Sequence, residues 1–378
     1  PATGSLGHAT VYFNGVYKTT AGVQANGTWT ATLTVPPNPG GMQTVTGSEL
    51  LWSWQQVSAL TRTPLPDLPI IFLPGLAGTE MLANSDFTLD ARPNPALCTG
   101  IWPDNGCRAT EQHDYDENDV IWLGWNAITA SFAGQHRYLD ALALDSDGIA
   151  AAADYYGVLP DIKPGEPLWN IGGVMPVYEP LDQFLRGMGY VRDHTLFYFP
   201  FDWRKDYTNL DQDLDEKIDL ALRESGKDKV ILIAHSTGGV VARNYLLRRG
   251  TAKVDQLITM GTPYIGSPVC ARAMEVGDDM GIGGHFFGDI GIGLHPKQGM
   301  ALAQNFAGLY DMLPSSLWFT PSPADQGAAP PPYLIRSYTQ GTTVVLEPLD
   351  FTQSTAWLAN RRNATLLNNG LTFQKQGI

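Results

Sequence analysis

The chain has 378 residues, of which 43% are hydrophobic and 16% charged, so it can bury a sizeable core and is not a disordered protein. It carries 24 Lys and Arg against 38 Asp and Glu, and the formal net charge of −14 argues against a nucleic-acid partner and against electrostatic docking on anionic membranes. No stretch approaches the roughly 20 apolar residues of a transmembrane helix. Pro1 opens directly onto strand-like sequence, without a signal peptide, so we expect a processed or truncated piece of a longer protein.

Residues 1–45 are predicted to form β-strands. Val11–Phe13 and Val16–Lys18 flank Asn14-Gly15, a pair that favours a two-residue hairpin turn. Residues 28–35 alternate threonines with apolar side chains, as in a half-buried strand. The stretch NGVYKTTAGVQANGTWTATLTV resembles the last strands of a bacterial immunoglobulin-like module. That resemblance implies a modular protein outside the cytoplasm, with more chain before Pro1; the alternative is a β-extension peculiar to this protein.

Proline and glycine mark a linker, which we place at residues 46–66. From residue 67 to 378, apolar strands alternate with helices, the pattern of an α/β fold with a parallel sheet. The expected strands lie at 69–73, 196–199, 230–233 and 257–260. Expected helices run along 239–247, through Leu214, Ile218, Ala221 and Leu222, and through Leu181, Phe184 and Leu185 on one face before Gly187-Met188-Gly189.

Ser236 is the candidate nucleophile. The segment Ala234-His235-Ser236-Thr237-Gly238-Gly239 stands between an apolar strand and a helix, the context that a nucleophile elbow requires. Such a serine adopts a strained turn, so the residues two before and two after it must be small; here they are Ala234 and Gly238. The helix N-terminus favours developing negative charge at the hydroxyl. His235 is expected to point away from that hydroxyl and to support the site from behind, and a structural serine in a tight turn is the alternative for Ser236.

A glycine-rich turn, Pro74-Gly75-Leu76-Ala77-Gly78-Thr79, follows the first strand of the predicted sheet. Acyl transfer requires two backbone N–H groups aimed at the oxyanion of the tetrahedral intermediate. We assign them to Leu76 and Thr237. A plain turn between strand and helix is the alternative interpretation of the loop.

Four segments together resemble the lecithin:cholesterol acyltransferase family, which includes the lysosomal phospholipase A2. In chain order they are IIFLPGLAGTEM, GYVRDHTLFYFPFDWR, VILIAHSTGGVVARNYL and LITMGTPYIGSP, and the resemblance covers roughly residues 68–378. Phe201-Asp202-Trp203-Arg204 is its most discriminating element. The resemblance implies an α/β-hydrolase with a cap and a lid, acting on the acyl group of lipid esters as a lipase, phospholipase or O-acyltransferase.

The resemblance also places a cap loop at about residues 90–125 and a lid at about 277–297. Cys98 and Cys107 lie in the cap segment, with Trp102 between them, and are expected to form a disulfide; two free thiols are the alternative. The lid segment combines many glycines with large apolar residues, among them Phe286 and Phe287, as in a flexible apolar flap. A disordered surface loop is the alternative there, and Cys270 is expected to be a buried, unreactive residue.

The acid and the histidine of a triad are expected after the serine in this fold. No histidine lies beyond His295, and the segment that holds Asp350 resembles part of the family's cap. We therefore expect the acid and the base to lie beyond Ile378, in a C-terminal fragment that could pair with the open sheet edge. Asp350 as the acid, and His285 or His295 as the base, are the alternatives.

The predicted function is that of a secreted or cell-surface serine esterase that forms an acyl-Ser236 intermediate on a lipid ester. No cofactor is expected, and no metal site, because no His-x-x-x-His or Cys-x-x-Cys pair is present. One rival class is a binding or adhesion module that reuses the hydrolase fold without chemistry. The other is a different α/β-hydrolase, such as a peptidase, which the apolar flap disfavours, or a dehalogenase, which Ser236 excludes. Water as the acyl acceptor gives a fatty acid and an alcohol gives an ester, and the sequence does not choose between the two.

Overall fold

The computed structural model describes residues 8–13, 16–22, 45–48, 68–89, 112–132, 136–149, 162–171, 175–277, 296–320, 332–340 and 343–376. The chain divides into two compact units, Pro1–Asp67 and Leu68–Ile378. Each unit is described by itself.

The first unit contains a three-stranded antiparallel sheet in the order β2-β1-β3. Its strands are β1 (His8–Phe13), β2 (Val16–Gly22) and β3 (Val45–Ser48). The predicted hairpin is confirmed, because Phe13 pairs with Val16 and Tyr12 with Tyr17. β3 reaches past residue 45, where we expected the linker to begin. Residues 28–35 lie outside the described ranges, and the immunoglobulin-like character of this unit stays a prediction.

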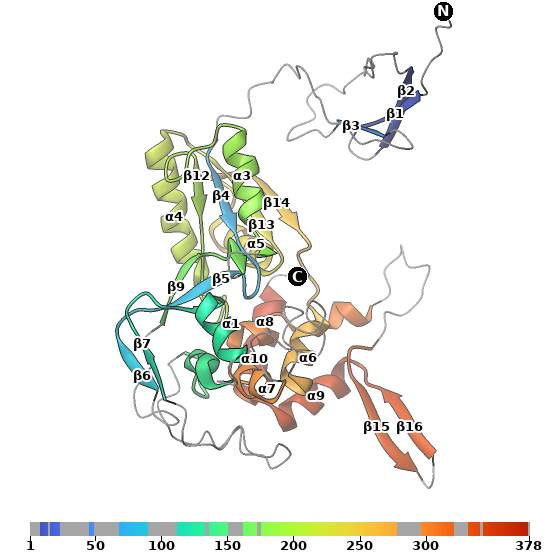
Figure 1. Ribbon diagram of the computed structural model, residues 1–378. Coiled ribbons are helices and arrows are strands. Elements are labelled where there is room, and N and C mark those ends of the chain that lie inside the picture. The colour runs from blue at the N-terminus through green and yellow to red at the C-terminus, as the bar shows by residue number, and fades with distance from the viewer. Residues whose placement is uncertain are drawn as a thin grey trace, which may run out of the picture. The chain divides into compact units, whose positions relative to one another are not determined.

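The second unit is built on a parallel four-stranded sheet in the order β12-β4-β13-β14 (Figure 1). The strands are β4 (Ile70–Leu73), β12 (Leu196–Tyr198), β13 (Val230–His235) and β14 (Val254–Met260). All four strands expected from the apolar runs are confirmed. β4 and β13 are buried on both faces, whereas β14 forms an edge and leaves Ile258 41% exposed.

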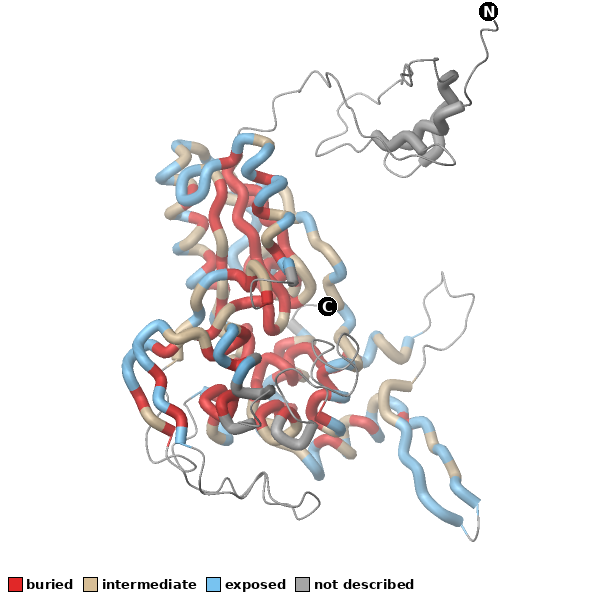
Figure 2. Tube along the Cα trace, in the orientation of Figure 1, coloured by how far each residue is buried: buried red, intermediate tan, exposed pale blue. Residues whose placement is uncertain are grey.

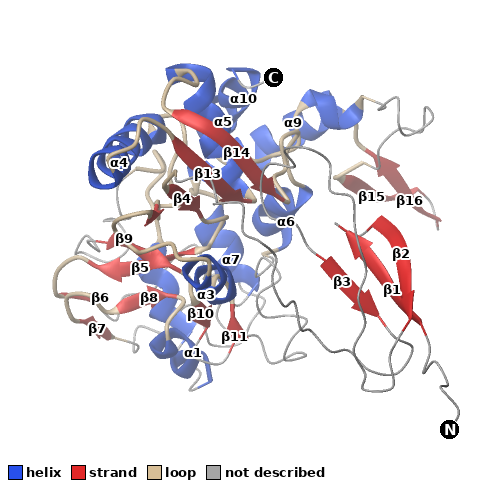
Figure 3. Ribbon diagram, turned by 90° about the horizontal axis from the view of Figure 1, so that it is seen from above, coloured by secondary structure: helices blue, strands red, loops and turns tan. Residues whose placement is uncertain are grey.

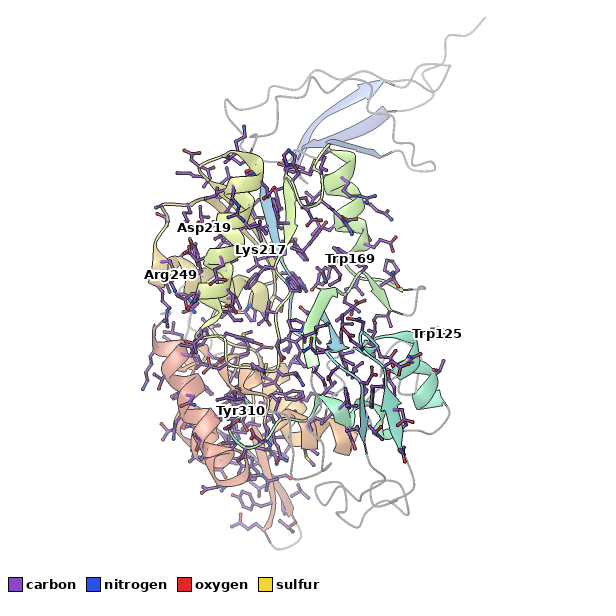
Figure 4. All side chains as sticks on the ribbon, turned by 90° about the vertical axis from the view of Figure 1, so that its left-hand side faces the viewer. Trp125, Trp169, Lys217, Asp219, Arg249 and Tyr310 are labelled. Carbon is purple, nitrogen blue, oxygen red and sulfur yellow. The ribbon has the colours of Figure 1, made fainter. Side chains whose placement is uncertain are left out.

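Helices α4 (Leu210–Ser225) and α5 (Thr237–Arg249) pack against each other and against β4 and β13. Figure 3 shows them on one side of the strands and α3 (Glu179–Gly187) on the other. Leu214, Ile218 and Ala221 turn inward from α4, as their spacing predicts. Ion pairs tie α4 to the end of α5 and to the turn after it, with Arg249 Nε 2.7 Å from a carboxylate oxygen of the buried Asp211 and Lys253 Nζ 2.6 Å from one of Asp219 (Arg249 and Asp219 are labelled in Figure 4). The Arg249 pair holds the last residue of the helix that begins next to Ser236.

Of the three apolar residues expected on one face of α3, Leu185 is buried, Leu181 is partly buried and Phe184 is 41% exposed. The buried face runs through Asp182 and Leu185, because the Asp182 carboxylate accepts hydrogen bonds from Arg192 and Tyr198. A paired carboxylate therefore forms part of the buried face of α3.

Short antiparallel sheets lie beside the main sheet, in the orders β8-β5-β9, β6-β7 and β10-β11. Their strands are β5 (Thr79–Ala83), β6 (Phe87–Leu89), β7 (His113–Tyr115), β8 (Val120–Trp122), β9 (Ile162–Pro167), β10 (Asn170–Ile171) and β11 (Met175–Pro176). Helix α1 (Trp125–Phe132) and the 3-10 helix η1 (His136–Leu142) follow β8. β5 begins where the glycine-rich loop ends, so these sheets hold one end of that loop.

The last part of the unit is mainly helical. It contains α6 (Pro268–Val276), α7 (Pro296–Ala303), α8 (Ala307–Asp311), the 3-10 helix η2 (Ser316–Phe319), α9 (Phe351–Arg361) and α10 (Ala364–Gln376). α10 packs closely on α8, and Figure 2 shows the buried residues continuing through these helices. The antiparallel hairpin of β15 (Ile335–Gln340) and β16 (Thr343–Pro348) projects from this region with no fully buried residue (Figure 2).

Candidate active site

Ser236 stands between the end of β13 and the first residue of α5. Its backbone has φ 48° and ψ −119°, a conformation that residues other than glycine rarely adopt and that costs on the order of 1–3 kcal/mol. The main chain holds it there, because Ser236 N donates to Met260 O at 2.8 Å and Gly239 N donates to Ser236 O at 3.0 Å. The strained turn predicted for the candidate nucleophile is thus present.

The neighbours of Ser236 are small for a reason that the packing shows directly. Ala234 is fully buried. A Cβ added to Gly238 would lie 2.5 Å from Pro74 O and 2.6 Å from Leu73 O, distances that no side chain could occupy unless the backbone moved. The turn therefore brings the start of α5 into contact with the end of β4.

That contact places the glycine-rich loop beside the serine. A Cβ on Gly75 would lie 3.0 Å from Ser236 Cβ. The loop turns sharply, since Gly78 N donates to Gly75 O at 3.0 Å and Ala77 has a positive φ of 58°. Leu76 follows Gly75 in this turn, so the turn brings it close to Ser236 although the two are 160 positions apart in the numbering.

Several backbone amides of these two segments are left without an acceptor. Among the residues that the structure describes, the N–H groups of Leu76, Ala77 and Thr237 donate to none, whereas those of Gly75 and Gly78 are both used. Thr237 is buried and stands at the first position of α5, where amide groups have no partner within the helix. Unpaired amides from both segments can therefore bind an anion next to Ser236.

Two tryptophans fix the far end of the loop. Trp122 Nε1 donates to Ala77 O at 2.8 Å, and Trp203 Nε1 donates to Thr79 O at 3.2 Å. Their rings pack with centroids 5.3 Å apart. Trp203 belongs to the motif that was most discriminating in the sequence, and the structure gives that motif a role as a support of the loop.

The rest of that motif forms a buried ion pair. Arg204 binds both carboxylate oxygens of Asp202, at 2.9 and 2.7 Å, and donates to Leu142 O at 3.0 Å. Burial acts to raise the pKa of Asp202, but the Arg204 guanidinium outweighs it and holds that pKa below its usual value. The pair joins the strand end after β12 to η1 and keeps Trp203 in place.

His235 does not contact the serine hydroxyl through a hydrogen bond. Its Nδ1 lies 2.9 Å from Tyr178 Oη, and burial lowers the pKa of its imidazole. Within the described ranges, no histidine is hydrogen-bonded to Ser236 Oγ. His285 and His295 lie outside those ranges, so their part in catalysis stays a prediction.

Asp350, the alternative for the triad acid, caps the start of helix α9. Its carboxylate accepts from Gln353 N at 2.8 Å and Gln353 Oε1 accepts from Asp350 N at 3.0 Å, a capping box at the start of α9. Capping of the unpaired amide groups at the start of α9 is a sufficient structural role for Asp350, and it requires no part in catalysis.

We expect replacement of Asp350 to separate the two interpretations. Asp350→Asn keeps a good capping side chain and should leave both stability and activity unchanged. Asp350→Ala should lower the free energy of unfolding by about 0.5–2 kcal/mol, because the cap is lost. Urea unfolding and ester hydrolysis measured on both variants would decide, since a triad acid would lose about 10⁴-fold in kcat on conversion to asparagine.

The remaining predicted site residues, Trp102, Phe286, Phe287, Cys98 and Cys107, lie outside the described residues. The expected burial of Cys270 is confirmed, and burial raises the pKa of its thiol to about 12; its lack of reactivity stays a prediction. In the described part of the chain, no group of three or more His, Cys, Asp or Glu is arranged to hold a metal ion. No helix in the same ranges has the length and apolarity to cross a bilayer.

The parallel sheet and the strained serine between β13 and α5 define an α/β protein with a nucleophile-elbow geometry. Residues 167–346 match the family model described as "Lecithin:cholesterol acyltransferase". This segment of the chain is similar to that family, whose fold is the α/β-hydrolase fold, and three of the four motifs quoted from the sequence, from GYVRDHTLFYFPFDWR onward, lie within it.

Similar proteins point to the same family over a shorter segment. The phosphatidylcholine-sterol acyltransferase of Gallus gallus is 34% identical over 27% of this chain and 26% of its own length. The phospholipase A(1) LCAT3 of Arabidopsis thaliana is 33% identical over 23% and 21%, and the phosphatidylcholine-sterol acyltransferase of Rattus norvegicus 35% over 27% and 24%. The chain thus spans about a quarter of the length of these relatives.

Among solved structures, a chain from "The crystal structure of Tle4-Tli4 complex" is 15% identical, with a TM-score of 0.38 over 82% of this chain and 71% of that chain. A similarity of this size supports no conclusion about fold or function.

Proposed function

We propose that the protein is a serine enzyme that hydrolyses or transfers the acyl group of lipid ester substrates through an acyl-Ser236 intermediate. One observation carries this proposal: a strained serine at the start of α5 faces a loop whose free amides, like that of Thr237, are available to an anion. The names of the relatives, a phosphatidylcholine-sterol acyltransferase and a phospholipase A(1), suggest the lipid class of the ester.

In the proposed reaction, Ser236 Oγ attacks the carbonyl carbon of the ester and its proton passes to a histidine base. The carbonyl oxygen becomes an oxyanion, which the amides of Leu76 and Thr237 bind. Collapse of the intermediate releases the alcohol, which takes the proton from the base, and leaves the acyl group on Ser236. Water then gives a fatty acid, and an alcohol gives a new ester. We propose that the base and its acid come from outside the described residues.

The proposed setting is outside the cytoplasm. A disulfide between Cys98 and Cys107 would persist in an oxidising compartment, and the overall negative charge favours uncharged lipid surfaces over anionic ones. Trp102, Phe286 and Phe287 are proposed to contact the acyl chain of the substrate. A binding module without catalysis would not require a strained serine beside unpaired amides, so this geometry favours the enzyme.

The test is incubation of the protein with phosphatidylcholine vesicles, first without a sterol and then with a sterol as acceptor. Mass spectrometry should detect fatty acid in the first case, and a sterol ester in the second if transfer competes with water. A fluorophosphonate should block both products and add its mass to the peptide that contains Ser236. Absence of acyl products together with absence of the adduct would support the binding module instead.

A further inference from the structure

Tyr178, the residue that precedes α3, connects the two halves of the candidate site. Its side chain is 8% exposed and its ring meets Phe72 of β4 edge-on, with centroids 4.9 Å apart. Gly75 N donates to Tyr178 Oη at 2.9 Å, and the same oxygen lies 2.9 Å from His235 Nδ1. One hydroxyl thus binds the glycine-rich loop on one side and the residue before the nucleophile on the other.

Tyr178 Oη accepts from Gly75 N–H, and among the described residues His235 Nδ1 is the acceptor within reach of its proton. We therefore assign the Tyr178 proton to the bond with His235 Nδ1. Nδ1 then acts as an acceptor, so the neutral ring carries its proton on Nε2. Burial lowers the pKa of His235, which favours this neutral form at neutral pH. The chain of bonds therefore runs from Gly75 through Tyr178 to His235 in one direction.

The surrounding contacts leave little room for adjustment. A Cβ on Gly75 would lie 2.8 Å from His235 Nδ1, and one on Gly78 would lie 2.5 Å from Tyr178 Oη. The loop therefore closes tightly over the tyrosine and the histidine. Any displacement of the hydroxyl would be transmitted to Gly75, and hence to the neighbouring amide of Leu76.

We propose that Tyr178 is a positioning residue, which holds the amide of Leu76 at the correct distance from Ser236 for oxyanion binding. This inference rests on the proposed function, because an oxyanion forms only if Ser236 attacks an ester. A tyrosine that merely fills the core would need the ring and not the hydroxyl. Removal of the hydroxyl alone separates the two roles.

The test is Tyr178→Phe, with Tyr245→Phe as the matched control. Tyr245 is also buried, and its hydroxyl donates a single hydrogen bond, to Asp215 Oδ1 at 2.8 Å, away from the loop. With a soluble ester, Tyr178→Phe should lower kcat about 10- to 100-fold with KM nearly unchanged, because a displaced oxyanion donor weakens binding of the transition state and not of the substrate. The control should keep kcat within about twofold of the unchanged protein, since its hydrogen bond lies outside the site.

Two further measurements do not depend on activity. Amide hydrogen exchange of residues 75–78 should be at least tenfold faster in Tyr178→Phe than in Tyr245→Phe, because the Gly75 amide loses its acceptor. In the unchanged protein, nitrogen NMR of His235 should show the Nε2–H tautomer. Equal exchange in the two variants, or an Nδ1–H tautomer, would overturn the proposal even if Ser236 is confirmed as the nucleophile. An inert protein with the expected exchange and tautomer would refute the proposed function and leave the Tyr178 contact as a support of the loop.

Discussion

Ser236→Ala should abolish ester hydrolysis, with a loss of about 10⁴- to 10⁶-fold in kcat. The effect is large because the Ser236 hydroxyl forms the covalent bond to the acyl group, and alanine offers no nucleophile in its place. The binding amides stay in place, so KM should change little. Hydrolysis of a short p-nitrophenyl ester, followed by absorbance, is the measurement.

The matched control is Ser225→Ala. Ser225 is the last residue of α4, and its hydroxyl donates to Ala221 O within its own helix. Its loss should leave kcat unchanged. Near-normal turnover by Ser236→Ala would show that the assignment of the nucleophile is wrong, and the strained conformation would then need another explanation.

The second large effect is expected at Gly238. Gly238→Ala introduces a methyl group within 2.6 Å of two backbone oxygens of the β4 end. One oxygen belongs to the last residue of β4 and the other to the residue after it. The steric clash can therefore be removed only if α5 and the glycine-rich loop move apart. We expect a loss of about 1–3 kcal/mol in the free energy of unfolding. In the fraction that folds, kcat should fall about 100-fold, because separation of Ser236 from the loop by about 1 Å misplaces the oxyanion donors.

Gly187→Ala provides the comparison in the same unit. Gly187 is the last residue of α3, and a Cβ added there would meet no atom within 4 Å. Alanine there should therefore stabilise the protein by about 0.5–1 kcal/mol. Urea unfolding of both variants, with kcat measured below the transition, checks the pair. A Gly238→Ala protein as stable and active as Gly187→Ala would mean that β4 and α5 are not in close contact.

The sequence could predict those parts of the site that depend on local structure. The turn around Ser236 follows from one apolar strand, small flanking residues and one helix, all within about 20 positions, and each was placed correctly. The glycine-rich loop was likewise visible, because it directly follows a buried strand. Local patterns of this kind survive in the fold when they agree with the tertiary packing.

The long-range contacts that join the segments of the site could not be predicted from local sequence patterns. Tyr178 is separated from Gly75 by 103 positions and Trp122 from Ala77 by 45, and neither stands in a pattern that marks a partner. The buried face of α3 also includes Asp182, which no apolar pattern marks as buried. A buried carboxylate needs a partner, and the partner Arg192 is identifiable only after the chain has folded.

The hairpin of β15 and β16 is a suitable place for an insertion into the chain. Its cross-strand contacts, such as the Arg336–Glu347 ion pair, lie within the hairpin, and its residues are exposed or only partly buried. Gln340 and Thr343, which flank the turn, are both exposed, so we expect length changes between them to be tolerated. A peptide tag or a fluorophore attached there would report on the protein while leaving the sheet and Ser236 undisturbed.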